Sequence, residues 1–136
     1  MFLCFSIDAK TKSEFVVASF NIRYDNEKDG LNSWKYRKDY VNSLIRFYEF
    51  DIFGIQEGLI NQVRDIETLN EYGRIGVGRD DGKEGGEHSA VFYRKDRFDL
   101  ISSGNFWLSE TPDKPSFGWD AQCRRICSWG KMKDKY

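Results

Sequence analysis

Two short runs of sequence determine which fold is expected: Phe-Val-Val-Ala-Ser-Phe-Asn at residues 15–21 and Asp-Ile-Phe-Gly-Ile-Gln-Glu at residues 51–57. Each run has the length and the β-branched and aromatic content of a buried strand, and each ends in a polar side chain. Between them, Ser33 can cap a helix over residues 34–48. Strand, helix and strand in this order predict a βαβ-like unit with neighbouring parallel strands, and so an α/β fold.

The rest of the chain continues the alternation of helix and strand. We expect a second helix over residues 59–70 and a loop rich in Ser, Thr, Pro and Gly over residues 105–118. Further strands are expected at 72–79, 89–94, 98–101 and 125–131. The Lys95-Asp96 turn predicts that strands 89–94 and 98–101 form a hairpin. The first helix carries an apolar stripe of Tyr40, Val41, Leu44, Ile45 and Tyr48, and the second carries Val63, Ile66 and Leu69.

Length and composition limit the class of protein. A chain of 136 residues with 40% hydrophobic and 16% aromatic residues can form one domain with a real core. A formal net charge of -1 excludes a strongly basic nucleic-acid coat, although not a local basic cleft. A single histidine excludes a zinc site built from several histidines, and three cysteines without paired spacing do not form a disulfide framework.

The first residues differ in character from the rest. Residues 1–9 are apolar and residues 10–14 are polar, which predicts either the remnant of a signal peptide or a ragged apolar terminus. The first interpretation would make the parent protein an exported one, periplasmic or secreted, and the second leaves the compartment open. We therefore divide the chain into a segment at 1–14 and a domain at 15–136.

Metal-competent oxygens follow the two strands that define the fold. Asn21 ends the first strand and Glu57 ends the second, so parallel pairing brings an amide and a carboxylate to one edge of the sheet. Oxygen ligands of this kind suit a hard cation such as Mg²⁺. Taken singly, Asn21 is equally an ordinary turn residue and Glu57 an ordinary solvated carboxylate at a helix start.

Six segments in order resemble the endonuclease/exonuclease/phosphatase family, the deoxyribonuclease-I-like metal-dependent phosphoesterases. They are residues 19–23, 51–57, 76–82, 86–94, 106–112 and 118–120, of which the last two resemble a bacterial subgroup. The resemblance covers residues 15–133. It implies a four-layered α/β/β/α sandwich with a mixed sheet and flanking helices, of which this chain would be the amino-terminal half.

The resemblance also implies roles for individual residues. Glu57 would be the principal ligand of a catalytic Mg²⁺ or Mn²⁺, and Asn21 would lie beside it and hold the phosphate or a metal-bound water. Glu87 matches the carboxylate that orients the catalytic histidine of the family. Arg125 matches a cationic position near the substrate phosphate, and Arg23 matches a phosphate contact of some nucleases.

Other family motifs are absent from the sequence. The Thr-His, Gly-Asp-Phe-Asn and Asp-His segments of the family do not occur here, and the resemblance places them in a second half. We therefore expect the isolated chain to hydrolyse phosphoesters poorly or not at all. Half of a sandwich leaves sheet faces and strand edges uncovered, so we also expect the chain to self-associate.

The residues leave the substrate and the alternatives to catalysis open. Gly58 and Leu59 follow Glu57 where deoxyribonuclease-type members carry an arginine, which favours a sugar phosphate, phospholipid head group or small phosphodiester over nucleic acid. A non-catalytic module that binds a glycan or a protein through its aromatic residues, and a truncated relic, remain alternatives. Three tryptophans could line such a cleft or simply pack in the core: Trp34, Trp107 and Trp119. His88 is expected beside a cleft or on the surface, and Tyr93 in the core.

Overall fold

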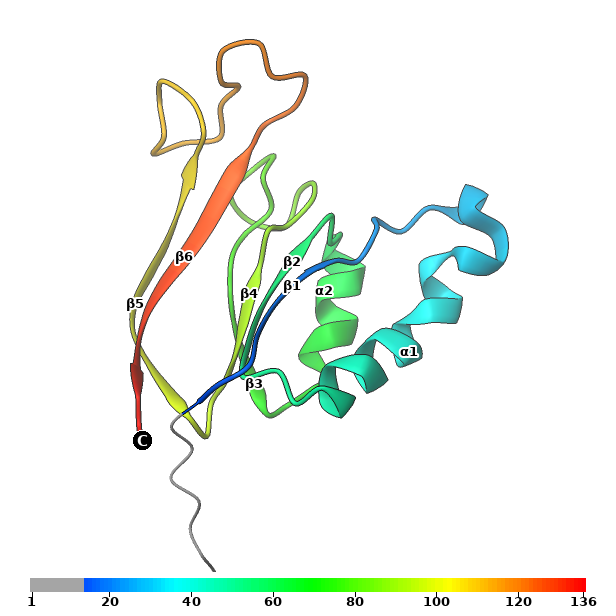
Figure 1. Ribbon diagram of the computed structural model, residues 1–136. Helices are drawn as coiled ribbons and strands as arrows, with labels where there is room; N and C mark the ends of the chain where they lie inside the picture. The colour runs from blue at the N-terminus through cyan, green and yellow to red at the C-terminus, as the bar shows by residue number, and fades with distance from the viewer. Residues whose placement is uncertain (1–13) are drawn as a thin grey trace, which may run out of the picture.

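Two helices, a four-stranded sheet and a two-stranded ribbon form three successive layers in the computed structural model, which describes residues 14–136 (Figure 1). The helices cover one face of the four-stranded sheet, and the ribbon lies against the other face. The expected apolar terminus lies outside the described residues, apart from Glu14. No helix within residues 14–136 has the length and apolar character needed to cross a membrane.

The elements follow one another in the predicted order, with shorter bounds at several places and longer ones for the last two strands, the first of which runs on to Trp107 inside the predicted loop. In chain order they are β1 (Val17–Asn21), the 3-10 helix η1 (Glu27–Asn32), α1 (Trp34–Phe47), β2 (Ile52–Gln56), α2 (Ile60–Glu67), β3 (Tyr72–Ile75), β4 (Val91–Arg94), β5 (Phe98–Trp107) and β6 (Ile126–Asp134).

The four-stranded sheet has the order β1-β2-β4-β3. Strands β1 and β2 are parallel neighbours, with Asn21 opposite Gln56, and α1 connects them. Strand β4 is antiparallel to both β2 and β3. The predicted βαβ-like unit and the mixed sheet are therefore confirmed, and Glu57 stands one residue beyond the last pair of β1 and β2.

The predicted hairpin of strands 89–94 and 98–101 is wrong. Strand β4 lies between β2 and β3, whereas β5 pairs with β6 in a second sheet, from Phe98 opposite Asp134 to Trp107 opposite Ile126. The turn at residues 95–97 leads the chain from one sheet to the other. Strands β2 and β3 occupy the two edges of β4, so β5 cannot pair with β4.

The main core lies between the helices and the four-stranded sheet. Val41 and Ile45 of α1 are buried, and so are Val63, Ile66 and Leu69, which confirms the second apolar stripe. Two rings at the sheet centre, Phe53 and Phe92, stack with centroids 4.9 Å apart. Tyr40, Leu44 and Tyr48 were expected in the first stripe and are instead exposed, Tyr40 to 79%, because only the Val41 and Ile45 side of α1 faces the sheet.

The ribbon packs on the sheet through β6, which contacts β3 and β4. Gly130 of β6 approaches so closely that a side chain there would collide with Ile75 of β3. At one end of the ribbon, the indole of Trp107 donates to the carbonyl of Arg79, 2.7 Å away. At the other end, the Arg97 guanidinium is buried beside Asp134 (2.9 Å) and Asp51 (3.6 Å). The two sheets are therefore joined at both ends.

Candidate active site

A cleft of about 450 Å³ opens at the carboxyl ends of β1 and β2. It brings together all five residues that the sequence nominated: Asn21, Arg23, Glu57, Glu87 and Arg125. Its other lining residues are Tyr24, Gln56, Arg79, Ser89, Leu108, Cys123, Arg124 and Ile126. One wall comes from the four-stranded sheet and its loops, and the facing wall comes from the segments that leave β5 and enter β6.

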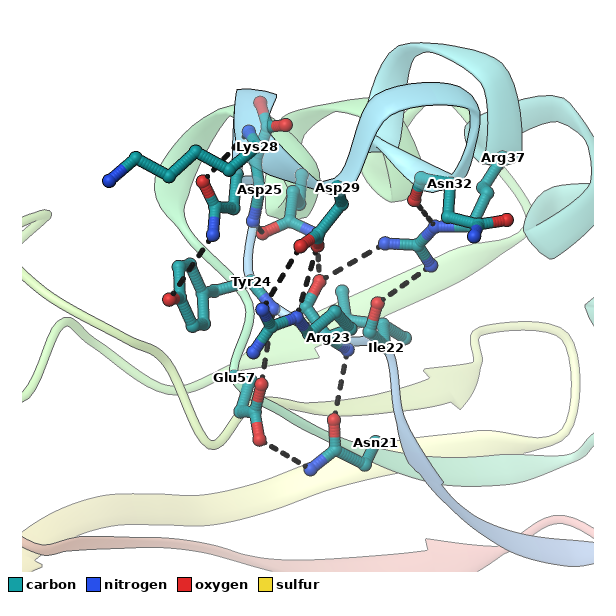
Figure 2. A network of polar contacts seen from close by, with 12 residues as sticks. Asn21, Ile22, Arg23, Tyr24, Asp25, Lys28, Asp29, Asn32, Arg37 and Glu57 are labelled. Atoms are coloured by element: carbon teal, nitrogen blue, oxygen red, sulfur yellow. Dashed lines mark hydrogen bonds and ion pairs between the residues drawn. The ribbon is translucent and has the colours of Figure 1, made fainter.

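Glu57 lies in a left-handed conformation, with φ of 62°. Its Oε1 accepts a hydrogen bond from Asn21 Nδ2 at 2.9 Å, and its Oε2 accepts one from the backbone N–H of Tyr24 at 3.2 Å (Figure 2). A glutamate rarely adopts a positive φ, because its Cβ crowds the following carbonyl. Here the backbone turn at the end of β2 aims the carboxylate at the end of β1.

The pKa of the Glu57 carboxyl lies below its ordinary value of 4.5. The hydrogen bond from Asn21 is the main cause, and the Tyr24 N–H and the charges of Arg23 and Arg79 act in the same direction against the opposing effect of burial. Glu57 is therefore ionised at neutral pH. Each oxygen accepts one hydrogen bond from the described residues and retains capacity for another partner.

The donor set suits a hard cation with few protein ligands. Mg²⁺ usually takes one or two carboxylates and keeps several waters, and an ionised Glu57 at the wall of an open cleft meets that requirement. Within residues 14–136 no group of three or more His, Cys, Asp or Glu side chains is placed to hold a metal. Within the described residues, a cation bound at Glu57 would therefore lie in an open site and not in a closed cage.

Asn21 has its amide fixed on both sides. Its Nδ2 donates to Glu57, and its Oδ1 accepts the backbone N–H of Arg23 at 2.9 Å. Arg23 also has a positive φ, 58°, and its guanidinium forms two hydrogen bonds of 3.1 Å with Asp29 while lying 4.3 Å over the Tyr24 ring. Figure 2 shows this chain of contacts running from Glu57 to η1. In this arrangement Asn21 orients the carboxylate, and Arg23 is held by Asp29.

Glu87 forms a two-pronged ion pair with Arg79. Arg79 Nη1 and Nη2 donate to the two carboxylate oxygens at 2.8 and 3.1 Å, and both side chains are largely shielded from water. The backbone N–H of Arg79 also donates to the carbonyl of Glu87 at 3.1 Å. The buried Nε of Arg79 has no hydrogen-bond partner within the described residues. Glu87 is therefore committed to one partner, and its charge is balanced in the wall of the cleft.

The facing wall carries two consecutive arginines. Arg124 is 3.5 Å from Asp80 and lies 4.6 Å over the ring of Phe117. Arg125 is exposed and forms no ion pair among residues 14–136. Its backbone carbonyl accepts the N–H of Leu108 at 2.8 Å, which holds the segment before β6 against the segment after β5. The guanidinium of Arg125 therefore remains available to a ligand.

Sequence reasoning missed Arg79 and the buried amide of Gln62, which bonds to the loop that follows β1. A signal for Arg79 exists in the glycines of residues 82–86, which let the chain fold back and bring Arg79 opposite Glu87. A signal for Gln62 is its place three residues after Leu59, whose N–H donates to its side chain at 3.1 Å, as at many helix starts.

His88 is fully buried, which corrects the expectation of a cleft-side or surface position. Its backbone N–H donates to Gly58 O at 2.7 Å and its ring Nδ1 is 3.1 Å from the same oxygen, so it is enclosed by the turns that follow β2 and β3. Burial lowers the pKa of the His88 ring. Tyr93 is half-buried over Gly73.

The tryptophans divide between core and surface. Trp34 and Trp107 are buried, as expected for packing residues, and neither lines the cleft. Trp119 is 77% exposed on the loop before β6. Two of the three aromatic residues that suggested a glycan-binding module are therefore out of reach of a ligand.

Known structures share this fold over about half of their own length. An endonuclease/exonuclease/phosphatase from Bacteroides vulgatus is 55% identical, with a TM-score of 0.85, over 86% of this chain and 46% of its own. The mannosyl-6-phosphatase of Bacteroides thetaiotaomicron is 50% identical, with a TM-score of 0.86, over 90% of this chain and 47% of its own.

A more distant neighbour shows the fold alone. TDP2 of D. rerio, solved with a single-strand DNA product, is 18% identical with a TM-score of 0.67, over 90% of this chain and 42% of its own. No family model matches the sequence. The chain spans less than half of the length of each of these three proteins.

Proposed function

Because the chain belongs to the endonuclease/exonuclease/phosphatase family, we propose that it provides the metal-binding and phosphate-binding part of a phosphoesterase. One observation carries the proposal. An ionised carboxylate, Glu57, and a guanidinium that forms no ion pair among residues 14–136, Arg125, line the same cleft at the carboxyl ends of two parallel strands. This is where α/β proteins place ligands, and the two charges suit a cation and a phosphate together.

Glu57 would hold the Mg²⁺ or Mn²⁺, and Asn21 would keep the carboxylate oriented through its Nδ2 hydrogen bond. The bound ion would supply a Lewis acid that polarises a phosphoryl oxygen and stabilises the leaving oxyanion. The hydrogen bonds from Asn21 and Tyr24 keep Glu57 ionised without an ion on site, so little reorganisation is needed before binding.

Arg125 would contact the phosphate, because its five N–H donors match phosphate oxygens and no carboxylate of the described residues is paired with it. Arg23 is a second candidate for that contact, and it would have to share its guanidinium with Asp29. Glu87, fixed by Arg79, would accept a hydrogen bond from a proton-carrying group supplied to the cleft. The only imidazole of the chain is buried, so we propose that the chain alone binds the phosphate group but turns over poorly.

The substrate class that we propose is a phosphate monoester of a sugar. The relative from Bacteroides thetaiotaomicron, at 50% identity, is a mannosyl-6-phosphatase. A formal net charge of -1, with Gly58 and Leu59 after Glu57, gives little attraction for a polyanion beyond the cleft itself. Nucleic acid is therefore the less favoured substrate.

Mn²⁺ titration of the chain and of its Glu57→Gln variant, followed by electron paramagnetic resonance, tests the metal site. We expect the variant to bind Mn²⁺ at least about 10-fold more weakly, because the amide lacks the charge of the carboxylate proposed to hold the ion. Glu49→Gln is a matched control, since Glu49 is exposed, has a φ of 49° and lies at the opposite end of β2. Equal affinity of the Glu57→Gln variant and the unaltered chain would refute the site.

Calorimetry with mannose 6-phosphate tests the substrate class, in the presence of Mn²⁺ and beside a single-stranded oligonucleotide. We expect the sugar phosphate to bind and Arg125→Met to weaken its binding, with little binding of the oligonucleotide at physiological salt. Preference for the oligonucleotide, with affinity that falls steeply as salt is raised, would instead support a nuclease.

A further inference from the structure

The buried amide of Gln62 bonds to both segments that carry the candidate metal site. Gln62 lies in the first turn of α2 and is 0% exposed. Its Oε1 accepts the N–H of Asp25 at 2.8 Å and the N–H of Leu59 at 3.1 Å, and its Nε2 donates to the carbonyl of Arg23 at 2.8 Å. One side chain thus satisfies three backbone groups from two segments that are far apart in sequence.

These three contacts lie on both sides of the hydrogen bond that the Tyr24 N–H donates to Glu57. Arg23 and Asp25 flank Tyr24, whose N–H donates to Glu57 Oε2 at 3.2 Å. Leu59 stands two residues beyond Glu57 in the turn that leaves β2. Gln62 therefore fixes the donor segment from both sides and the acceptor segment from one side.

A second side chain holds the same loop from outside. Arg37 of α1 donates to the carbonyl of Ile22 at 2.9 Å and, at 3.4 Å, to the carbonyl of Arg23 that also accepts from Gln62 (Figure 2). Of these two side chains, Gln62 is the one that bonds to both the loop after β1 and the turn after β2. An apolar side chain in its place would leave the N–H groups of Asp25 and Leu59 without their partner.

We propose that Gln62 is a positioning residue of the metal site: it holds the Tyr24 N–H against Glu57 and so keeps the carboxylate turned into the cleft. The proposal rests on the proposed function for the metal, and the geometric part of it can be measured without any metal. Outer contacts that orient a metal ligand commonly change metal affinity by about 10-fold or more when they are removed.

Gln62→Met keeps the size of the side chain and removes all three polar contacts. Amide hydrogen exchange of the metal-free chain, followed by nuclear magnetic resonance, is expected to show the Tyr24 N–H exchanging at least about 10-fold faster in this variant. The Ile55 N–H, which donates to Ala90 O at 2.8 Å in the sheet, reports general loosening and is expected to change less. Mn²⁺ affinity is expected to fall about 10-fold.

Asn61→Ala is the matched control. Asn61 is the neighbouring residue on α2 and donates to the side chain of Asp25 at 2.9 Å, so it touches the same loop but none of its backbone groups. We expect this variant to leave both the Tyr24 exchange rate and the Mn²⁺ affinity unchanged. If Gln62→Met fails to fold, Gln62→Glu replaces it, because the carboxylate keeps the two acceptor contacts and loses the donor to Arg23.

The outcomes separate this proposal from the proposed function. If Gln62→Met speeds hydrogen exchange equally at the Tyr24 and Ile55 amides, Gln62 only stabilises the fold by packing and the proposal is wrong. An unchanged exchange rate at Tyr24 would also overturn the proposal. A chain that binds no Mn²⁺ would overturn the proposed metal site, while the exchange rates would still decide whether Gln62 holds Tyr24 against Glu57.

Discussion

Two residues at the cleft, Arg23 and Glu57, adopt left-handed backbone conformations with φ of 58° and 62°. Such conformations cost about 1–2 kcal/mol each for residues other than glycine, and they persist where surrounding contacts impose them. Here the contacts are visible, since Asn21 bonds to the Arg23 N–H and to the Glu57 carboxylate. The local strain serves to turn two charged side chains toward one cleft.

Stability at acid pH should depend on Glu57. The pKa of Glu57 is lowered in the folded protein, so its ionised form stabilises the fold above the ordinary value of 4.5, and this stabilisation is lost as the pH falls through the lowered pKa. We expect the unaltered chain to exceed the Glu57→Gln variant in free energy of unfolding at neutral pH. The difference should shrink on acidification below about pH 4.5.

Urea denaturation of metal-free protein at a series of pH values measures that difference, with Glu49→Gln as the control for the substitution itself. Stability curves that stay parallel down to about pH 3 would contradict the prediction, because they would mean that Glu57 binds protons equally in the folded and unfolded chain.

For single residues, the sequence allowed the strand-end residues to be predicted. It did not reveal the residues that contact segments far away in the sequence. Asn21 and Glu57 could be found because strand ends are visible in the hydrophobic pattern, and parallel pairing then places them together. Arg79 and Gln62 make their contacts through loops whose closure no periodicity reveals. The left-handed turn at Glu57 has no sequence signal either, since glutamate does not favour it.

At the scale of elements, the buried cluster around Arg97 ties the two sheets together. Its guanidinium donates to Asp134 at the end of β6 and to the carbonyl of Glu14 before β1, and it lies near Asp51 at the start of β2. The Arg97 and Asp51 side chains are 4% and 2% exposed. A charge buried this deeply is expensive to leave without its counter-charge.

Arg97→Met should therefore lower the Tm by more than about 5 °C, because it leaves the Asp51 and Asp134 carboxylates without their common counter-charge. Arg64→Met is the control, since the pair of Arg64 with Glu84 is exposed on both sides and should shift the Tm by only about 1–2 °C. Thermal unfolding followed by circular dichroism measures both. Similar shifts in the two variants would show that burial adds nothing to the Arg97 cluster.

The same cluster explains why element types could be predicted from the sequence while one pairing could not. Strands β4 and β5 flank a short polar turn, which is the usual local signal for a hairpin. The partner strand of β5 and the counter-charges of Arg97 lie far away in sequence, at β6, Asp134 and Asp51. Local pattern therefore gave the helices, most strands and the βαβ-like unit, but not the partner of β5.

At the scale of the whole molecule, apolar side chains remain exposed on strands that are edges of the described sheets. Val17 of β1 is 63% exposed and Ile101 of β5 is 58% exposed, and Trp129 of β6 is partly exposed. Strand β1 is an outer strand of the order β1-β2-β4-β3, and β5 and β6 have only each other within the described residues. Such edges favour pairing with another chain.

We therefore propose that the isolated chain self-associates, and we expect light scattering at micromolar concentration to show dimers or larger species. Ile101→Lys should shift the distribution toward monomer, because a charge on β5 opposes edge pairing. Leu31→Lys is the control, since Leu31 is 83% exposed but lies in η1, away from both sheets. A sharp monomer peak for the unaltered chain, with a cooperative melt, would contradict the proposal.

The cleft is bounded by both sheets, with Glu57 contributed by one and Arg125 by the entry to the other. A ligand that contacts both Glu57 and Arg125 must lose one of these contacts before the two sheets can separate. Binding free energy is then added to the adhesion between the layers, by about 2.7 kcal/mol when the ligand is present at 100 times its Kd. If the cleft binds a metal-associated phosphate group as proposed, the free energy that holds the two layers together rises with the concentration of that ligand.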